Sequence, residues 1–305
     1  MRYLSYSVLL LLSLFLTSCE KGLELFQEKD LLERPTSKRC AECHENIYNQ
    51  FKESRHAMSW ISPEFKRGSE NYSKEKCLSC HAPYEISINE KPKLRDAHRE
   101  DGVNCVACHF RDSTKSMHGP YDVFSPPHPS TQDLTYTKAE ICSGCHQETY
   151  KQWKMVGTDK NCQQCHMPAE KGRLIQKFPF TYMHLPKEVH HHGFIVPKSK
   201  PEFFEVKAEK ADKTLRLTIL NKKVPHNVPT ADNGKPKYYV DVTFFKDGKE
   251  VYSDSITVLP NDPFVNGREK VLEFNSIAEF DKVKVVLSRK LSWQERAEKI
   301  ASYDF

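Results

Sequence analysis

The chain has 305 residues, of which 38% are hydrophobic and 29% are charged. This length is enough for about two domains. The apolar fraction is low for a chain of this size, so its side chains alone supply only a modest core. The formal net charge of +5 combines 46 basic and 41 acidic residues, and so small an excess does not identify a nucleic-acid-binding protein.

Residues 1–18 have the pattern of an export leader. Arg2 gives a positive start, and the apolar run at 8–16 is too short to span a bilayer. The following Leu16-Thr17-Ser18-Cys19 resembles the lipobox of bacterial lipoproteins, in which cleavage precedes a cysteine that becomes acylated. We expect lipid on Cys19 and a charged tether over 19–37; the alternative is an ordinary secreted protein with a stray cysteine.

One short pattern recurs five times between residues 40 and 166. Each copy has two cysteines three positions apart and a histidine directly after the second. The copies are Cys40-Ala-Glu-Cys43-His44, Cys77-Leu-Ser-Cys80-His81, Cys105-Val-Ala-Cys108-His109, Cys142-Ser-Gly-Cys145-His146 and Cys162-Gln-Gln-Cys165-His166. They use ten of the eleven cysteines, which leaves no pair for a disulfide.

Cys-x-x-Cys-His is the attachment signature of c-type haem. The two thiols add to the porphyrin vinyl groups, and the histidine supplies one axial nitrogen to the iron. Zinc would accept the cysteine pairs, but it does not require a histidine after every second cysteine. We therefore expect five covalently bound haem c groups, attached through the ten cysteines and ligated by His44, His81, His109, His146 and His166.

Five haems change the meaning of the composition. Each porphyrin brings a large apolar surface, so haems replace much of the missing core in the first half. Removal of the leader leaves a charge of about +4, and five ferric haems with their propionates add roughly −5. The oxidised protein is then nearly neutral. Because haem is attached outside the cytoplasm, we expect a lipid-anchored protein on the periplasmic side of a bacterial envelope.

The remaining histidines supply candidates for the second axial position. Residues 45–58 lack glycine and proline and predict a helix that ends before Pro63. On that helix His56 would lie about 18 Å from His44, so we expect it to bind the iron of a haem other than the one at Cys40 and Cys43. The alternative is a surface histidine.

Three further candidates surround the third motif: His98, His118 and His128. Prolines at 120, 126, 127 and 129 exclude regular structure between the last two. A histidine held between prolines loses little further entropy on binding a metal, which favours His128. Residues 147–155 predict a short helix between the fourth and fifth motifs. His184 and the triplet 190–192 follow, and at most two of the three can reach one iron.

The composition changes near residue 200. Cysteine disappears, and alternating apolar stretches occur at 203–208, 215–220, 238–245, 251–259 and 283–287. Residues 246–249 predict a hairpin turn, and six or seven strands indicate a small antiparallel β-sandwich. We expect a closing helix at 293–303. His226 lies between Pro225 and Pro229 and is another ligand candidate, unless it is hydrogen-bonded within its own loop.

The predicted fold class is therefore α+β. A pentahaem domain of short helices and irregular segments covers 38–200, and a β-rich domain covers 201–305.

Several connecting segments resemble the multihaem cytochrome superfamily that includes hydroxylamine oxidoreductase, its tetrahaem cytochrome partner and pentahaem nitrite reductase. The resemblance covers about 38–232. The matching pieces are Ser54-Arg55-His56-Ala57, Gly102-Val103-Asn104-Cys105, Gly119-Pro120-Tyr121 with His128, Cys165-His166-Met167-Pro168, His192-Gly193-Phe194, and Val224-Pro225-His226-Asn227-Val228-Pro229-Thr230. The resemblance implies closely spaced haems in a conducting chain and adds His192 to the ligand candidates.

The chain also departs from these relatives. Pentahaem nitrite reductases usually carry one Cys-x-x-Cys-Lys haem, whereas every motif here ends in histidine. Hydroxylamine oxidoreductase has more haems and a tyrosine cross-link to its catalytic haem, and no tyrosine here can be assigned that role.

Two functions remain. The chain has 14 histidines, so nine remain beyond the five proximal ones, enough to close every iron. This surplus favours an electron carrier. We expect its partners to be redox proteins, either a membrane quinol-oxidising donor or a periplasmic acceptor, and we expect no nucleic-acid partner. The alternative is a reductase of nitrite, hydroxylamine or tetrathionate with one open haem.

Overall fold

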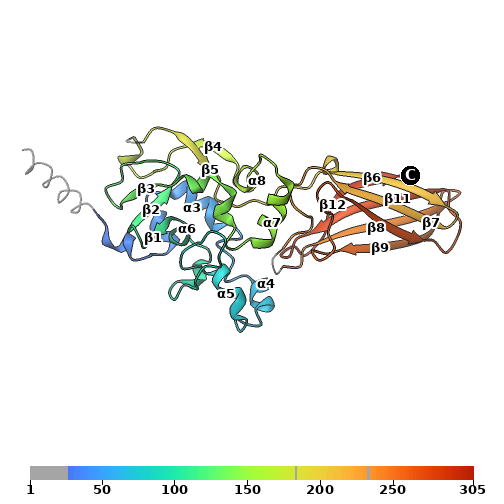
Figure 1. The fold of residues 1–305 in the computed structure, drawn as a ribbon, viewed down its shortest axis with the longest axis horizontal. Coiled ribbons are helices and arrows are strands. Elements are labelled where there is room, and N and C mark those ends of the chain that lie inside the picture. The colour runs from blue at the N-terminus through green and yellow to red at the C-terminus, as the bar shows by residue number, and fades with distance from the viewer. Residues whose placement is uncertain (1–26, 183, 232–233) are drawn as a thin grey trace, which may run out of the picture. The chain divides into compact units, whose positions relative to one another are not determined.

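The computed structural model describes residues 27–182, 184–231 and 234–305. Contacts divide the chain into two compact units, which we call the N-terminal unit (1–141 with 167–195) and the C-terminal unit (142–166 with 196–305) (Figure 1). The leader, Cys19 and the first part of the predicted tether lie outside the described residues. No helix in the described part is long and apolar enough to cross a membrane.

The N-terminal unit consists of short elements joined by irregular segments. Its helices are α2 (Ser37–Cys40), α3 (Glu45–Lys52), α4 (Pro63–Gly68), α5 (Glu75–His81) and α6 (Cys105–His109). Its strands are β1 (Phe110–Arg111), β2 (Ser116–Gly119), β3 (Ser130–Gln132), β4 (Ala169–Gly172) and β5 (Lys187–His190). β1, β2 and β3 form one sheet, and β4 pairs antiparallel with β5. As predicted, residues 120–129 contain no helix or strand.

The predicted helix over 45–58 is too long. α3 ends at Lys52, and the chain continues in turns through residue 61. The Ser54 amide donates to the Phe51 carbonyl at 2.8 Å, and the Ser54 hydroxyl accepts from the Ala57 amide at 3.1 Å. Serine side chains that bond nearby backbone in this way compete with helical hydrogen bonds. His56 is therefore not on the helix, and the 18 Å separation assumed for it does not apply.

The C-terminal unit contains a β-sandwich. Strands β10 (Glu269–Asn275), β7 (Thr214–Asn221) and β6 (Phe204–Ala211) form one sheet. Strands β12 (Glu298–Asp304), β11 (Lys282–Lys290), β8 (Lys237–Lys246) and β9 (Lys249–Val258) form the other. Alternate residues of each sheet are buried and meet in a shared core that includes Leu217, Phe244 and Phe274. The hairpin predicted at 246–249 joins β8 to β9, and the predicted α+β class is confirmed.

The end of the chain was predicted incorrectly. Residues 298–304 form β12, which pairs antiparallel with β11, in place of the closing helix expected over 293–303. Ile300 and Ala301 are buried in the sandwich core. Packing against β11 therefore outweighs the local helical pattern.

The two compact units do not follow the predicted boundary at residue 200. Residues 142–166 carry the fourth and fifth motifs, with α7 (Gln147–Val156) and α8 (Cys162–His166), and they group with the β-strands. The Gln152 side-chain oxygen accepts from the Asn227 amide at 3.3 Å and from the Thr230 hydroxyl at 2.9 Å. These bonds join α7, a helix predicted from the sequence, to the loop that follows β7.

Candidate haem-binding sites

The motifs form tight helical turns. The His44 amide donates to the Cys40 carbonyl at 2.9 Å, and the His146 amide to the Cys142 carbonyl at 3.0 Å. The second, third and fifth motifs lie within α5, α6 and α8. Residues three apart on a helical turn face the same side. Both thiols of a motif can therefore reach one porphyrin, with the histidine directly beside them.

Three motif histidines face a second histidine that is distant in sequence. The ring centroids are 6.4 Å apart for His44 and His128, 6.2 Å for His109 and His192, and 6.5 Å for His166 and His226. The first two pairs lie in the N-terminal unit and the third in the C-terminal unit. Each of these three motif histidines is thus opposed by one of the candidates proposed from the sequence.

The spacing of these rings fits an iron between them. A metal-bound imidazole nitrogen lies about 2 Å from the ion, and the ring centre about 1 Å farther, so two opposed ligands have centroids about 6 Å apart. A tetrahedral zinc site would bring the same two centroids to about 5 Å. The observed separations match the opposed arrangement, which is the axial geometry of six-coordinate haem.

Backbone carbonyls orient four of these rings. Nδ1 of His44 lies 2.6 Å from the Leu174 carbonyl, and Nδ1 of His109 lies 2.7 Å from the His118 carbonyl. Nδ1 of His192 lies 2.7 Å from the His190 carbonyl. A carbonyl only accepts, so each Nδ1 carries the hydrogen and Nε2 is left to bind metal. The fourth ring is His226, whose Nδ1 lies 2.8 Å from the Asn227 carbonyl.

Burial keeps five rings of these three pairs neutral. Burial lowers the pKa of His192 to about 4. It also lowers the pKa of four other rings in these pairs: His44, His109, His128 and His226. Imidazole binds a metal in its neutral form. The protein therefore holds these side chains in the charge state that ligation requires.

The second motif has a similarly oriented histidine. Nδ1 of His81 lies 2.7 Å from the Ser59 carbonyl, and the Phe65 ring stacks on the imidazole with centroids 3.7 Å apart. The hydrogen bond places the hydrogen on Nδ1, and the stacked ring restricts rotation of the imidazole.

The first and third motifs lie next to each other. The Cys40 and Cys105 side chains are close enough to shift each other's pKa, upward for Cys40 and downward for Cys105. The Ser37 hydroxyl donates to the Asp101 carboxylate at 2.9 Å and accepts from the Cys105 amide at 3.4 Å. Two haem attachment points are therefore side by side.

The loop that carries His226 is held by Asn221 at the end of β7. The Asn221 amide nitrogen donates to the carbonyls of Val224 and His226, at 3.1 and 3.0 Å. The Asn221 oxygen accepts from the Val224 amide at 3.1 Å. Asn221 is fully buried. The β-rich part of the chain thus supplies the imidazole that faces the fifth motif.

His56 is fixed in the N-terminal unit by its backbone. Its carbonyl accepts from the Val103 amide at 3.0 Å, and its ring lies 4.0 Å from the Phe194 ring, centroid to centroid. Gly102 has φ +62°, and a Cβ there would lie 2.2 Å from the His56 carbonyl oxygen. Only glycine allows this approach. Ligation by His56 stays a prediction.

The other two candidates from the sequence have different surroundings. The His98 side chain is 46% exposed, with Nδ1 3.7 Å from Glu100. Both ring nitrogens of His118 are engaged, Nε2 with the Thr114 hydroxyl at 2.8 Å and Nδ1 with Asp133 at 3.3 Å. His98 is exposed, and His118 has no ring nitrogen left to face an iron. We therefore leave both residues out of the proposed ligand set.

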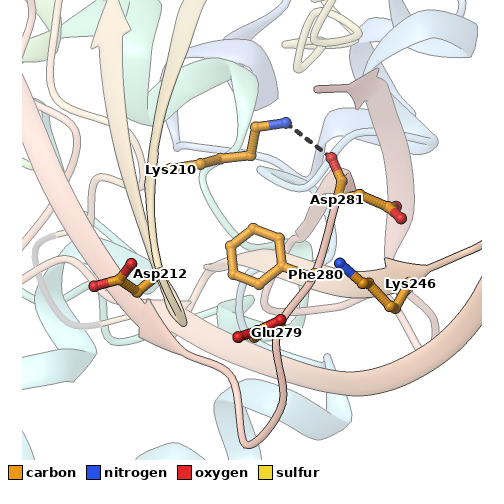
Figure 2. A pocket seen from close by; sticks show the side chains of 6 residues that line it. All are labelled: Lys210, Asp212, Lys246, Glu279, Phe280 and Asp281. Atoms are coloured by element: carbon orange, nitrogen blue, oxygen red, sulfur yellow. Dashed lines mark hydrogen bonds between the residues drawn. The ribbon is translucent and has the colours of Figure 1, made fainter.

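A surface hollow lies at the other end of the sandwich from His226. Figure 2 shows its lining: Lys210, Asp212, Lys246, Glu279, Phe280 and Asp281. The Lys210 ammonium donates to the Asp281 carbonyl at 3.0 Å. The hollow is beside the start of β7, whereas His226 follows its end, about 25 Å along the strand. It contains no cysteine or histidine, so it is not one of the candidate haem sites.

Comparison with known proteins gives two informative matches. Residues 39–110 match the protein family described as "Cytochrome c554 and c-prime". A penta-heme cytochrome c552 from Thermochromatium tepidum is similar over 90% of this chain and 99% of its own, with a TM-score of 0.60 and 17% identity. A β-glucuronidase of glycoside hydrolase family 2 matches 33% of the chain with a TM-score of only 0.18, and no curated protein matches. Together with the repeated haem attachment motifs, these matches support a multihaem c-type cytochrome.

Proposed function

We propose that the chain binds five haem c groups and transfers electrons along them between redox partners in the bacterial envelope. The observation that carries the proposal is the set of three opposed imidazole pairs, with centroids 6.2 to 6.5 Å apart. An iron with both axial positions filled changes redox state with little rearrangement. It also has no free position for a substrate, which favours a carrier over a reductase.

Each bound haem would supply an iron that gains and loses one electron. The cysteines hold the porphyrin covalently, and we assign three axial pairs: His44 with His128, His109 with His192, and His166 with His226. His81 and His146 are the proposed proximal ligands of the other two haems. The carbonyls at Nδ1 fix the rings and raise the basicity of Nε2, and burial keeps water away from the iron.

Contact between attachment points supports transfer from haem to haem. The Cys40 and Cys105 side chains lie next to each other, so the porphyrins attached to the first and third motifs would be neighbours. Close neighbours exchange electrons by tunnelling. A catalytic haem would also use such a chain, so proximity alone does not exclude a reductase.

We further propose the periplasmic side of the envelope as the location, with lipid on Cys19. The apolar leader and the lipobox support this, as does the need to attach haem outside the cytoplasm. A membrane quinol-oxidising protein and a periplasmic acceptor are the proposed classes of partner.

Intact mass and redox titration test the proposal. We expect the mass of the purified holoprotein to exceed that of its polypeptide by five haems, and the titration to show several distinct potentials. A smaller haem count would contradict the cofactor assignment. Turnover of nitrite, hydroxylamine or tetrathionate at useful rates would contradict the carrier and favour the reductase.

A further inference from the structure

Arg95 is a buried cation whose hydrogen bonds all go to neutral groups. It is 3% exposed, and a haem bound nearby would only bury it further. The five N–H groups of its guanidinium donate to four carbonyls and one side-chain amide: Ala97 at 2.9 Å, Pro83 at 3.0 Å, His98 at 2.7 Å, Gly102 at 2.8 Å and Asn104 at 3.0 Å. Buried charges are normally paired with an opposite charge, and a guanidinium stays protonated in folded proteins. Arg95 therefore holds its charge inside the fold without a bonded carboxylate.

This guanidinium lies against the third haem motif. Asn104, the residue before Cys105, caps α6: its side-chain oxygen accepts from the Ala107 amide at 3.0 Å and also from Arg95. Two hydrogen bonds therefore link the guanidinium to an amide between the two attachment cysteines, over no more than about 6 Å. Burial raises the pKa of the Cys108 thiol to about 12, and the charge of Arg95 acts against that rise. The charge thus acts at the place where the third haem is attached.

The charged residues of segment 95–115 and their ion-pair partners Arg34 and Glu85 have both signs. The basic ones are Arg34, Arg95, Arg99, Arg111 and Lys115, and the acidic ones are Glu85, Asp96, Glu100, Asp101 and Asp112. Their formal charges cancel, so the segment has no net field of one sign. Four of the five basic side chains lie 3.1 to 3.9 Å from a carboxylate oxygen. Within this described group, Arg95 is the basic residue whose partners are neutral.

A positive charge fixed in the interior raises the reduction potential of a redox centre beside it. Reduction adds an electron to the iron, and a nearby cation stabilises that electron more strongly in the protein interior than in water. Net charge, hydrogen bonding and burial are the means by which proteins set such potentials. Because five hydrogen bonds hold the guanidinium in place, its charge is already oriented before the electron arrives.

We propose that Arg95 is a fixed positive charge that raises the reduction potential of the haem on the third motif. The inference rests on the proposed five-haem electron carrier and deepens it, because the potential of each haem decides where along the chain an electron rests. A purely structural Arg95, which only ties together the turn over 97–104, would need the hydrogen bonds but not the charge.

Redox titration of the holoprotein, followed by electron paramagnetic resonance, tests this with Asn104→Asp. Aspartate has the same shape, caps a helix equally well and accepts the same two hydrogen bonds, but its charge neutralises the guanidinium 3.0 Å away. The amide nitrogen that it replaces has no hydrogen-bond partner in the described structure. We expect the potential of one haem to fall while the other four stay unchanged. That haem is the one whose low-spin signal His192→Ala removes.

Three further variants separate charge from hydrogen bonding. Arg95→Lys keeps the charge with fewer donors and should leave the potential near that of the wild type, whereas Arg95→Gln should lower it. Asp101→Asn removes a negative charge that reaches the same motif through Ser37, so it should shift the potential upward. If the Arg95 variants do not fold, Asn104→Asp and Asp101→Asn still decide the question by the opposite signs of their shifts.

Three results would overturn the inference. They are unchanged potentials in Asn104→Asp, a fall in Arg95→Lys as large as that in Arg95→Gln, and a shift confined to the signal of another haem. The titration needs no redox partner or substrate, and intact mass reports the number of haems independently. Failure of the carrier function would therefore be seen separately from failure of the role assigned to Arg95.

Discussion

At the scale of single residues, the most informative feature is the orientation of the paired histidines. His109 and His192 have ring centroids 6.2 Å apart, and the Nδ1 atom of each lies 2.7 Å from a backbone carbonyl. Such contacts are set by the fold and leave no mark in the sequence. They fix the tautomer, so that Nε2 of each ring is the nitrogen left to bind a metal.

The first prediction concerns His192→Ala. We expect one haem to lose its sixth ligand and to change from low-spin to high-spin, because His192 is the imidazole that we pair with His109, at a centroid distance of 6.2 Å. The matched control is His191→Ala: the Nδ1 of His191 accepts from the Gly193 amide at 3.0 Å, so its loss should not alter any iron. Optical spectra of both ferric variants measure this. An unchanged low-spin spectrum for His192→Ala would remove that residue from the ligand set.

A second residue-scale prediction concerns Asp112. The Tyr84 hydroxyl, followed by Lys115 and Arg34, lowers the pKa of this carboxylate to about 2. A lowered folded-state pKa gives stability that is present above the unfolded value and lost as pH falls toward the folded one. The side chain is 36% exposed, so Asp112→Asn should cost about 1 kcal/mol at neutral pH.

Denaturant unfolding of the wild type and Asp112→Asn at several pH values measures this difference. We expect it to shrink as pH falls from about 4 to about 2. A difference that is independent of pH would show that Asp112 contributes through packing rather than through its charge.

At the scale of elements, Gly102 joins two segments that carry ligand candidates. Its positive φ and the close His56 carbonyl leave no room for a side chain. We expect Gly102→Ala to displace the turn at 54–58 and to cost at least about 2 kcal/mol in the free energy of unfolding. If His56 is a ligand, one haem also becomes high-spin. Gly68→Ala is the control, since a Cβ there meets nothing within 4 Å. Equal stability and spectra for the two variants would contradict this account.

The elements also show what a sequence can predict. The hairpin between β8 and β9 and the helix α7 follow local patterns, a turn between alternating strands and a run without glycine or proline, and both were predicted. α3 was predicted too long because the Ser54 hydroxyl, which accepts from the Ala57 amide, competes with helical hydrogen bonds just after it. β12 was missed because its strand character comes from pairing with β11.

The residues of the candidate haem sites also include some that the sequence predicts and some that it does not. The ten attachment cysteines and five proximal histidines follow from spacing alone. The opposing histidines occur at irregular intervals, and their partners are set by long-range contacts. Sequence reasoning therefore identified His128, His192 and His226 as candidates but could not pair them, and it included His118, whose ring nitrogens bond Thr114 and Asp133.

At the scale of the whole molecule, redox centres and β-strands are not cleanly separated along the chain. The fifth motif faces His226 in the loop after β7, and α7 is hydrogen-bonded to the same loop. If His226 binds iron as we propose, the β-rich part is a structural component of the redox unit. This explains why residues 142–166 group with the strands rather than with the first three motifs.

We propose that the chain carries electrons through closed, six-coordinate haems. Electron paramagnetic resonance of the fully oxidised holoprotein, recorded with and without added nitrite or cyanide, tests it most directly. We expect low-spin ferric signals for all or nearly all haems, including those of the three imidazole pairs, with no change on addition of either anion. A full haem equivalent of high-spin signal that shifts when nitrite is added would contradict it and identify a reductase.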